Sequence, residues 1–593
     1  MKLRVVFIST LVLLCSLSLF AQDWAQWSFD PQHRSAVSTV GQSLNQNIVN
    51  IVYDPLVPQE MAESAVIYGA NVLLAHYQDP LVDGNDVYMM YKSGQYNIRN
   101  YSSQQWGETK YTWNGSHTAL SVAWQFSSDW NAAGDLIDDW EPVFHPALAN
   151  GYIYVPGKGG SVFKVNKSSG VGTRLNPFPT DDGGTKANVD VLSPITVDSF
   201  GNIYYNVVQF NNDVNIFQND VIDSWLVKIT PSDAITAVSY SVLTAGAPAA
   251  TDLCVNTFSA NADGTIVNGP WPPSPTAVPN SVPCGTQRPG FNVGPAIAPD
   301  GTIYVATRAH FISREAFLLA INPNLTQKWM ATLRNRFHDG CGVPISLGGT
   351  LPPNGTPGGC RAGANYGVDP ATNAPGGGRI LDDESSTPVV APDGSILFGA
   401  YTRYNYAQGH MMRFSSTGTY LGGYFFGWDV TPGIWSHGGT YSIATKDNHY
   451  GDTGSYCNDP TFCPPDVSGR AYPEAYFVTQ LSPTLRADAL ADRGDKLMTV
   501  EWSYQNTNTQ SCTRDANNNI TCTSTNPNGF EWCVNAFVID GNGALYANSE
   551  DGWLYKIQQG GIVSAAPGCG TTTFACGGKI FQQLALGAAY TPT

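Results

Sequence analysis

The chain has 593 residues and a formal net charge of −17, with 60 Gly, 39 Pro, 15 Trp, 29 Tyr, 25 Phe and only 13% charged residues. Glycine and proline interrupt helices while aromatic residues favour pleated strands, so this composition predicts an all-β protein. A nucleic-acid partner needs a basic stripe, which is missing, and anionic membranes are disfavoured by the same charge; cations and neutral ligands stay open.

Residues 1–21 have the pattern of a secretory signal peptide. A basic start is followed by an apolar run from Val5 to Phe20, and Ala21 is a suitable cleavage position. The run is too short for a membrane anchor, and no later stretch is long and apolar enough to span a bilayer. We therefore expect a secreted or periplasmic protein whose mature part, residues 22–593, is a single domain.

Of the 12 cysteines, Cys15 lies in the signal peptide and eleven remain. An oxidising compartment favours their pairing, although the sequence does not fix the connectivity. Pairing between neighbours would leave Cys533 alone and would give Cys254–Cys284, Cys341–Cys360, Cys457–Cys463, Cys512–Cys522 and Cys569–Cys576.

One motif recurs along the mature chain: a small or polar residue, Pro, an apolar pair, a turn with Asp-Gly or Asn-Gly, and an apolar-aromatic strand. Such turns accept the positive φ of a tight hairpin, so each copy predicts a short inner strand and a second strand. The copies are "FHPALANGYIYV", "LSPITVDSFGNIYYNV", "VGPAIAPDGTIYVAT", "STPVVAPDGSILFGA", "TPGIWSHGGTYSIAT", the Pro-less "VNAFVIDGNGALYANS" and the divergent "SAVIYGANVLLAHY".

Tails such as "FLLAINPNLTQKWMATL" and "HMMRFSSTGTYLGGYFF" predict third and fourth strands, and four strands per repeated unit are typical of β-propeller blades. With Pro592 as an eighth anchor, we expect an eight-bladed β-propeller, with seven as the alternative count. The ending "AAYTPT" is then the first strand of a truncated last blade. The other anchors are Ala65, Pro146, Pro194, Pro295, Pro388, Pro432 and Ala536.

The tails resemble the pyrroloquinoline-quinone (PQQ) repeat, in which a turn and Gly precede a docking Trp on the outer strand. Trp329 fits this pattern best, and Trp124 and Trp502 stand at similar places. The opening "DWAQWSFDPQHRSAV" also resembles the leader of secreted PQQ-like propellers. The resemblance covers most of residues 23–593 and implies the quinoprotein alcohol dehydrogenase-like fold, but the repeat also builds non-enzymatic propellers.

In the dehydrogenases of that family, PQQ lies in the channel over a Trp, below a vicinal disulfide and near calcium, and an Asp is the general base. This chain has no adjacent Cys pair and no CxxCH haem motif. A ligand- or protein-binding scaffold is therefore favoured, with a PQQ- and calcium-dependent dehydrogenase of alcohols or sugars as the alternative. The candidate bases in that case are Asp383, Glu384, Asp429 and Glu531.

Carboxylates precede most anchors by three to five residues, and equivalent propeller positions form a ring around the channel. The ring predicts an acidic mouth that concentrates a cation, with oxygen ligands suited to Ca²⁺; turn capping is the alternative. Tryptophans beside it could stack a sugar or quinone, or only pack the blades. The ring is Glu60, Glu141, Asp190, Asp383, Glu384, Asp429 and Glu531, with Trp140, Trp428, Trp435 and Trp532.

Two long insertions, about 334–360 and 446–466, carry cysteines that argue for ordered loops. We expect them to set specificity for a protein or glycan partner. None of the nine histidines forms a short-spaced pair, so we expect them to be core or surface residues; the alternative is that His145, next to an anchor, faces the channel.

Overall fold

The computed structural model describes most of residues 22–593. The predicted signal peptide, Trp140, Asp383, Glu384, Pro592 and most of both insertions lie outside the described residues. The described residues are 23–41, 49, 51–68, 73–97, 101–131, 141–178, 188–211, 219–256, 276, 278–337, 368–369, 372–382, 385–402, 409–424, 426–449, 475–487, 495–514, 520–524, 526–551 and 554–563. No helix among them is long and apolar enough to cross a membrane.

Short strands dominate the first half of the chain. The elements are α1 (Val57–Tyr68), β1 (Leu81–Asp83), β2 (Asp86–Gly94), η1 (Tyr101–Ser103), β3 (Gln104–Trp113), β4 (Leu120–Ser127), β5 (Ala147–Ala149), β6 (Tyr152–Pro156), η2 (Lys158–Gly160), β7 (Val162–Asn166), β8 (Gly172–Leu175), β9 (Val189–Val191), β10 (Thr196–Val197), β11 (Ile203–Phe210), β12 (Val221–Ile229), β13 (Ile235–Ser239), α2 (Tyr240–Leu243), β14 (Leu253–Val255) and β15 (Ser281–Pro283).

The second half continues in the same way. Its strands are β16 (Gln287–Pro289), β17 (Ala296–Ile297), β18 (Ile303–Ala309), β19 (Ala316–Ile321), β20 (Gln327–Thr332), β21 (Val368–Asp369), β22 (Ala374–Pro375), β23 (Val389–Val390), β24 (Ile396–Ala400), β25 (His410–Phe414), β26 (Tyr420–Tyr424), β27 (Gly433–His437), β28 (Thr440–His449), β29 (Ala475–Ala487), β30 (Lys496–Gln505), β31 (Gln510–Arg514), β32 (Ile520–Ser524), β33 (Val538–Ile539), β34 (Leu545–Asn548), β35 (Leu554–Gln558) and β36 (Ile562–Val563).

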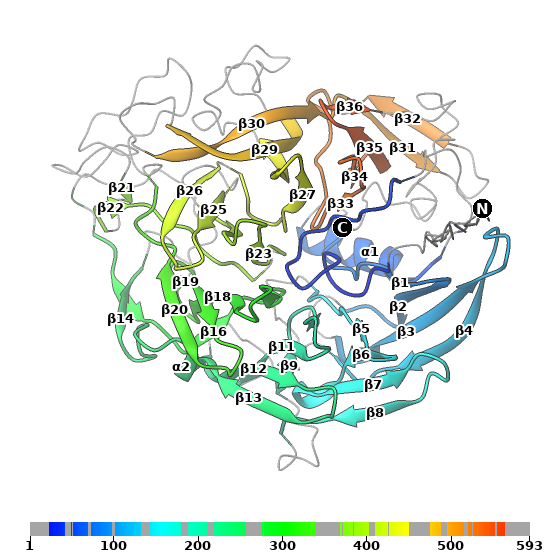
Figure 1. Ribbon diagram of the computed structural model, residues 1–593, viewed down its shortest axis with the longest axis horizontal. Helices are drawn as coiled ribbons and strands as arrows, with labels where there is room; N and C mark the ends of the chain where they lie inside the picture. The colour runs from blue at the N-terminus through cyan, green and yellow to red at the C-terminus, as the bar shows by residue number, and fades with distance from the viewer. Residues whose placement is uncertain are drawn as a thin grey trace, which may run out of the picture.

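These strands form sheets that follow one another around a ring, so the molecule is an all-β protein with a propeller-like arrangement (Figure 1). Within the described ranges, five sheets have four or five strands, and one has eight. The eight-stranded sheet consists of two antiparallel halves, β23–β26 and β27–β30, joined by a single parallel pair between Gly423 and Leu497. The all-β prediction is confirmed, whereas the count of eight blades is not.

Six of the seven predicted hairpins are present, and their turns have the expected chemistry. In "STPVVAPDGSILFGA", β23 pairs with β24, and Gly394 in the turn has a φ of +78°. The Asp393 carboxylate accepts the Ser395 amide and closes this turn. The tails form the third and fourth strands, such as β19 and β20. Local turn residues therefore determine these units.

The seventh hairpin, "SAVIYGANVLLAHY", was predicted wrongly. Its first half belongs to helix α1, which includes the supposed anchor Ala65, because Gln59–Ala65 is rich in good helix formers and lacks a turn residue. The first unit begins instead at Pro80, in "DPLVDGNDVYMMY", where β1 pairs with β2 around Gly84. This segment has the complete motif of Pro, apolar pair, turn glycine and aromatic strand, so the sequence did contain the signal.

The three docking tryptophans lie where the repeat predicts them. Trp124 of β4 packs on Gly170 in the β7–β8 turn of the next sheet, and Trp329 of β20 packs on Gly418 in the β25–β26 turn. Each indole N–H donates to a turn carbonyl, that of Lys167 or Ser416. Trp502 similarly lies against Gly561 in the β35–β36 turn. Each indole thus joins one sheet to the next.

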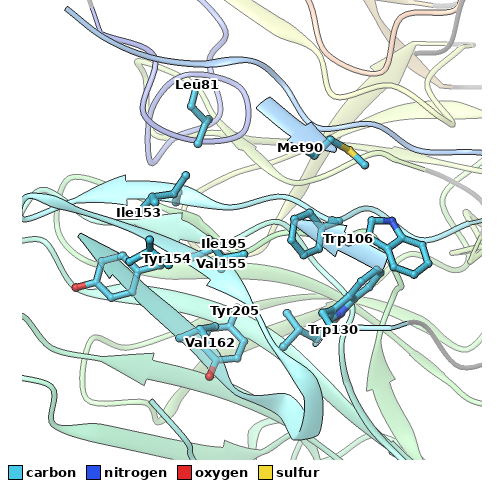
Figure 2. Packing of buried hydrophobic residues seen from close by; sticks show 14 of the residues in the cluster. Leu81, Met90, Trp106, Trp130, Ile153, Tyr154, Val155, Val162, Ile195 and Tyr205 are labelled. Carbon is cyan, nitrogen blue, oxygen red and sulfur yellow. The ribbon is translucent and has the colours of Figure 1, made fainter. Parts of the chain in front are cut away.

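Buried side chains between neighbouring sheets form the core. In the largest cluster, Trp106 and Trp130 meet edge to face with ring centroids 5.0 Å apart. Figure 2 shows these rings in the same cluster as Ile153 and Tyr205, which come from two further sheets. Apolar burial of this kind contributes most of the folding free energy.

The predicted Cys254–Cys284 disulfide is present, next to the β14–β15 pair. The register of β31 and β32 places Cys512 opposite Cys522. Cys533 is a free thiol. The three other predicted pairs lie outside the described residues.

The N-terminal segment 24–37, here called the leader, runs through the centre of the ring and meets the inner strand of each unit in chain order (dark blue in Figure 1). An inner strand has one unpaired edge, and the leader supplies acceptors for its amides. Its hydrogen bonds join Trp24 to Val82 of β1, Ala25 to Leu148 of β5, the Gln26 side chain to Val197 of β10, Pro31 to Ile297 of β17, Gln32 to Val390 of β23, Arg34 to Ile434 of β27 and Ser35 to Ile539 of β33.

Candidate binding face

The segments that precede the anchors join one another around one face of the ring, here called the loop face. The Glu141 amide donates to the carbonyl of Leu74, and the Thr431 amide donates to the carbonyl of Asn535. Between them, Asn292 links its unit to two others, donating its amide to Leu192 and accepting the Val143 amide. These hydrogen bonds link neighbouring pre-anchor segments, while the predicted ring of carboxylates stays a prediction.

The carboxylate of Glu141 is neutralised rather than exposed. Lys92, at the end of β2, places its Nζ 2.8 Å from Glu141 Oε2 and 2.8 Å from Asp54 Oδ2. All three side chains are buried. Burial alone would lower the pKa of Lys92, but the carboxylates Glu141, Asp54 and Glu60 together raise it above its usual value. The lysine therefore occupies the place that a cation was expected to fill.

Glu60 is fully buried and reaches this group from helix α1, not from a pre-anchor segment. Its Oε1 accepts the Leu74 amide at 2.5 Å, and its Oε2 has no hydrogen-bond partner. Burial raises the pKa of Glu60 to about 8, against the attraction of Lys92. Burial therefore favours the neutral form of Glu60, and Lys92 opposes this.

Asp429 is paired with a second lysine. Its Oδ2 lies 2.9 Å from Lys446 Nζ, and its Oδ1 accepts a hydrogen bond from the Ser385 hydroxyl. Its φ of +53° is uncommon for a residue other than glycine. Asp429 is thus held rigidly on the loop face as one half of an ion pair.

Glu531 contributes its backbone to the next unit, accepting from the Glu550 amide and the Ser549 hydroxyl through its carbonyl oxygen. The nearby Cys533 thiol donates to Glu550 Oε1. Burial raises the pKa of Cys533, so the thiol is not an activated nucleophile. Asp190 is buried in β9 opposite Val208, while Asp383 and Glu384 fall outside the described residues.

Three of the four predicted tryptophans lie among the described residues, and each has a packing contact. Trp532 is fully buried, donates to the Tyr476 carbonyl and packs edge to face against Tyr555. Trp435 stacks on His437 and contacts Gly543 in the β33–β34 turn. Trp428 lies edge to face with Tyr401. The ligand roles of the three remain predictions, and their positions are those of packing residues.

The axis of the ring is filled by side chains of the leader. His33 is fully buried, with its Nδ1 within 3.0 Å of the Pro388 carbonyl oxygen and its Nε2 3.3 Å from the Thr196 hydroxyl. Trp27 meets His145 edge to face, so His145 contacts the leader rather than an open channel. Burial lowers the pKa of His33 to about 4 and that of His145 to about 3.

The sequence analysis missed an arginine-rich sector between β16 and β24. Arg288 binds both oxygens of Asp382, at 2.8 and 2.6 Å, and Arg308 approaches the same carboxylate at 3.3 Å. The Arg288 Nε donates to His310 Nδ1. Although burial opposes it, the two guanidinium groups lower the pKa of Asp382. The clustering of arginines at 288, 308, 314, 334, 336 and 379 was the available signal.

Beside this sector lies a cavity of about 20 Å³, lined in part by Arg314, Arg334, Arg379 and Asp369. Arg314 is paired with Asp369, and Arg334 is paired with Glu315. Arg379 is fixed by a bridge to Tyr401 in which each backbone amide donates to the other carbonyl. The cavity is thus a rigid, arginine-lined pocket.

The fold and this face define an all-β, propeller-like protein whose leader lies inside the ring and whose loop face carries buried ion pairs. No family model matches the chain, and no curated protein matches it. Among solved structures, it is similar to the quinohemoprotein alcohol dehydrogenase from Comamonas testosteroni, with 10% identity over 92% of this chain and 73% of that chain and a TM-score of 0.40. It is also similar to a putative 6-phosphogluconolactonase from Bacteroides uniformis, with 11% identity over 71% and 85% and a TM-score of 0.27. We draw the fold from the sheets themselves and no function from these similarities.

Proposed function

We propose that this protein is a secreted or periplasmic β-propeller scaffold that binds a protein or glycan ligand at its loop face. The main support is the leader, which bonds to the inner strand of every described unit and places its own residues in the middle of the ring, where the dehydrogenases of the resembled family hold PQQ. The Cys254–Cys284 disulfide agrees with an oxidising compartment.

The described residues do not fit the alternative, a PQQ- and calcium-dependent dehydrogenase. Among them, no group of three or more His, Cys, Asp or Glu side chains is arranged to hold a metal ion. Lys92 and Lys446 already neutralise Glu141 and Asp429. Trp428, Trp435 and Trp532 each pack against a neighbouring ring. We therefore derive no catalytic step, and calcium at the mouth stays a prediction that depends on Asp383 and Glu384.

Calorimetric titration of the folded protein with PQQ, with and without Ca²⁺, separates the two functions. We expect no calcium-dependent PQQ binding and no dye reduction with ethanol or glucose. Saturable, calcium-dependent PQQ binding with dye reduction would contradict the scaffold proposal. A lower melting temperature after calcium is chelated would support the predicted calcium site, but it would not distinguish the scaffold from the dehydrogenase.

A further inference from the structure

A lysine and an aspartate are enclosed together where the segment before α1 lies beside the first unit. The Lys92 amide donates to the Tyr53 carbonyl, which holds this segment next to the end of β2. Lys92 Nζ lies 2.8 Å from Asp54 Oδ2 and 2.8 Å from Glu141 Oε2, and the three side chains are at most 2% exposed. Folding therefore brings an amine and two carboxylates together from three places in the chain and removes them from water.

Hydrogen-bond donors fix both carboxylates. The Tyr77 hydroxyl donates to Asp54 Oδ2 at 2.7 Å, and the Leu56 amide donates to Asp54 Oδ1 at 2.9 Å. The Trp106 indole donates to Glu141 Oε1 at 3.3 Å. The amine and the carboxylates are thus held in one arrangement, which gives a reaction between them a high effective concentration.

Burial makes this ion pair costly and makes the protons of the ammonium transferable. Burial lowers the pKa of Lys92, but the surrounding carboxylates raise it further, so the resting form is the ammonium and a base must take a proton from it. Burial raises the pKa of Glu141, although Lys92 opposes this, so Glu141 is suited to be that base. Buried charges recover only part of their lost hydration from each other, and a neutral amide in place of the pair removes two of them.

We propose that Lys92 and Asp54 condense to an isopeptide bond, with Glu141 as the catalytic base that transfers the protons. Lys92 Nζ forms a bond to Asp54 Cγ, and the bond from Cγ to Oδ2 breaks. One of the three ammonium hydrogens stays on the amide nitrogen, and Glu141 transfers the other two in turn to Oδ2, which leaves as water. Oδ1 remains as the amide oxygen and keeps the hydrogen bond from the Leu56 amide. The condensation consumes no further reactant, and the inference does not depend on the scaffold function.

The test is mass spectrometry of the mature chain after its disulfides are reduced and the chain is digested with trypsin. Between Arg34 and Arg99, the single trypsin site is Lys92. We expect a peptide of residues 35–99 that is uncut at Lys92 and about 18 Da lighter than its sequence, because one water is lost. Further cleavage with chymotrypsin should leave the parts that carry Asp54 and Lys92 joined. An unmodified lysine gives the separate peptides 35–92 and 93–99 instead.

Glu141→Gln tests the base, since glutamine keeps the size of the side chain but accepts no proton. The folded variant, checked by near-ultraviolet circular dichroism, should give the two separate peptides. The matched control is Lys110→Met, which removes a lysine of β3 that lies 2.7 Å from Asp86 in a partly exposed ion pair. This variant should still give the joined, lighter peptide.

Two separate, unmodified peptides from the folded wild-type chain overturn the isopeptide bond, whether or not any variant folds. A link from Lys92 to another carboxyl overturns the choice of Asp54. A complete link in folded Glu141→Gln overturns the role of Glu141 as the base.

Discussion

Glu108, on β3, is a carboxylic acid enclosed by the first sheet. It is fully buried, its Oε1 accepts a hydrogen bond from Gln78 at 3.1 Å, and its Oε2 has no hydrogen-bond partner. Burial raises the pKa of Glu108 from 4.5 to about 8. Between these values the folded chain keeps a proton that the unfolded chain releases. This group therefore favours folding at low pH, and its contribution is lost as the pH rises toward 8.

We predict that Glu108→Gln flattens the dependence of stability on pH. Glutamine keeps the shape and the acceptor of the protonated acid but has no proton to lose. The variant and the wild type should have the same melting temperature near pH 5, and the variant should melt at a higher temperature at pH 8. Between these values the free energy of unfolding of the wild type should fall relative to that of the variant by about 1.4 kcal/mol for each pH unit. Glu63→Gln, on helix α1, is the control for loss of a carboxylate. Parallel pH profiles for wild type and Glu108→Gln would refute the buried, protonated state.

At the scale of elements, neighbouring units are joined by an indole that rests on a turn. Trp329 of β20 covers Gly418, whose φ is +83° and where a Cβ atom would come within 2.9 Å of the ring. Glycine is thus required twice, by the backbone conformation and by the close approach of the ring. The same contact recurs at Trp124 and Gly170.

We predict that Trp329→Ala lowers the free energy of unfolding by about 3 kcal/mol, because both the ring contact and a hydrogen bond are lost. Trp329→Phe keeps an aromatic ring but loses the donor to Ser416, so it should lower the free energy of unfolding by about 1 kcal/mol. Trp113→Ala is the control, since this ring contacts His117 within its own hairpin. Urea unfolding measures all three, and equal losses for Trp329→Ala and Trp113→Ala would exclude a docking role.

At the scale of the whole molecule, the leader satisfies inner-strand amides in every described unit, from Val82 of β1 to Ile539 of β33. Without the leader, these buried amides would have no hydrogen-bond acceptors. The combined cost in folding free energy would exceed the loss of any single contact. The leader therefore holds the units in one ring.

We predict that deletion of residues 22–41 lowers the melting temperature by more than about 10 °C, because several buried hydrogen bonds are lost at once. A synthetic peptide of residues 23–41 should restore the melting temperature in a saturable way, and a scrambled peptide should not. An unchanged melting temperature after the deletion would show that the leader does not stabilise the ring.

What the sequence by itself determined is local. The Asp-Gly and Asn-Gly turns and the alternating strands predicted the hairpins, since adjacent residues decide turn conformation. The Cys254–Cys284 pair and the docking tryptophans followed from spacing and from the repeat. The helix over Val57–Tyr68 was missed because a divergent copy was preferred to the complete motif at Pro80.

What only the tertiary structure decided is which distant groups meet. The sequence showed the repeated carboxylates but not their pairing with lysines. Lys92 reaches Glu141 from another unit, and Lys446 reaches Asp429 across a sheet. The path of the leader and the meeting of Arg314, Arg334 and Arg379 also depend on how the ring closes. Electrostatics depends on distance in space, which turn and strand patterns do not encode.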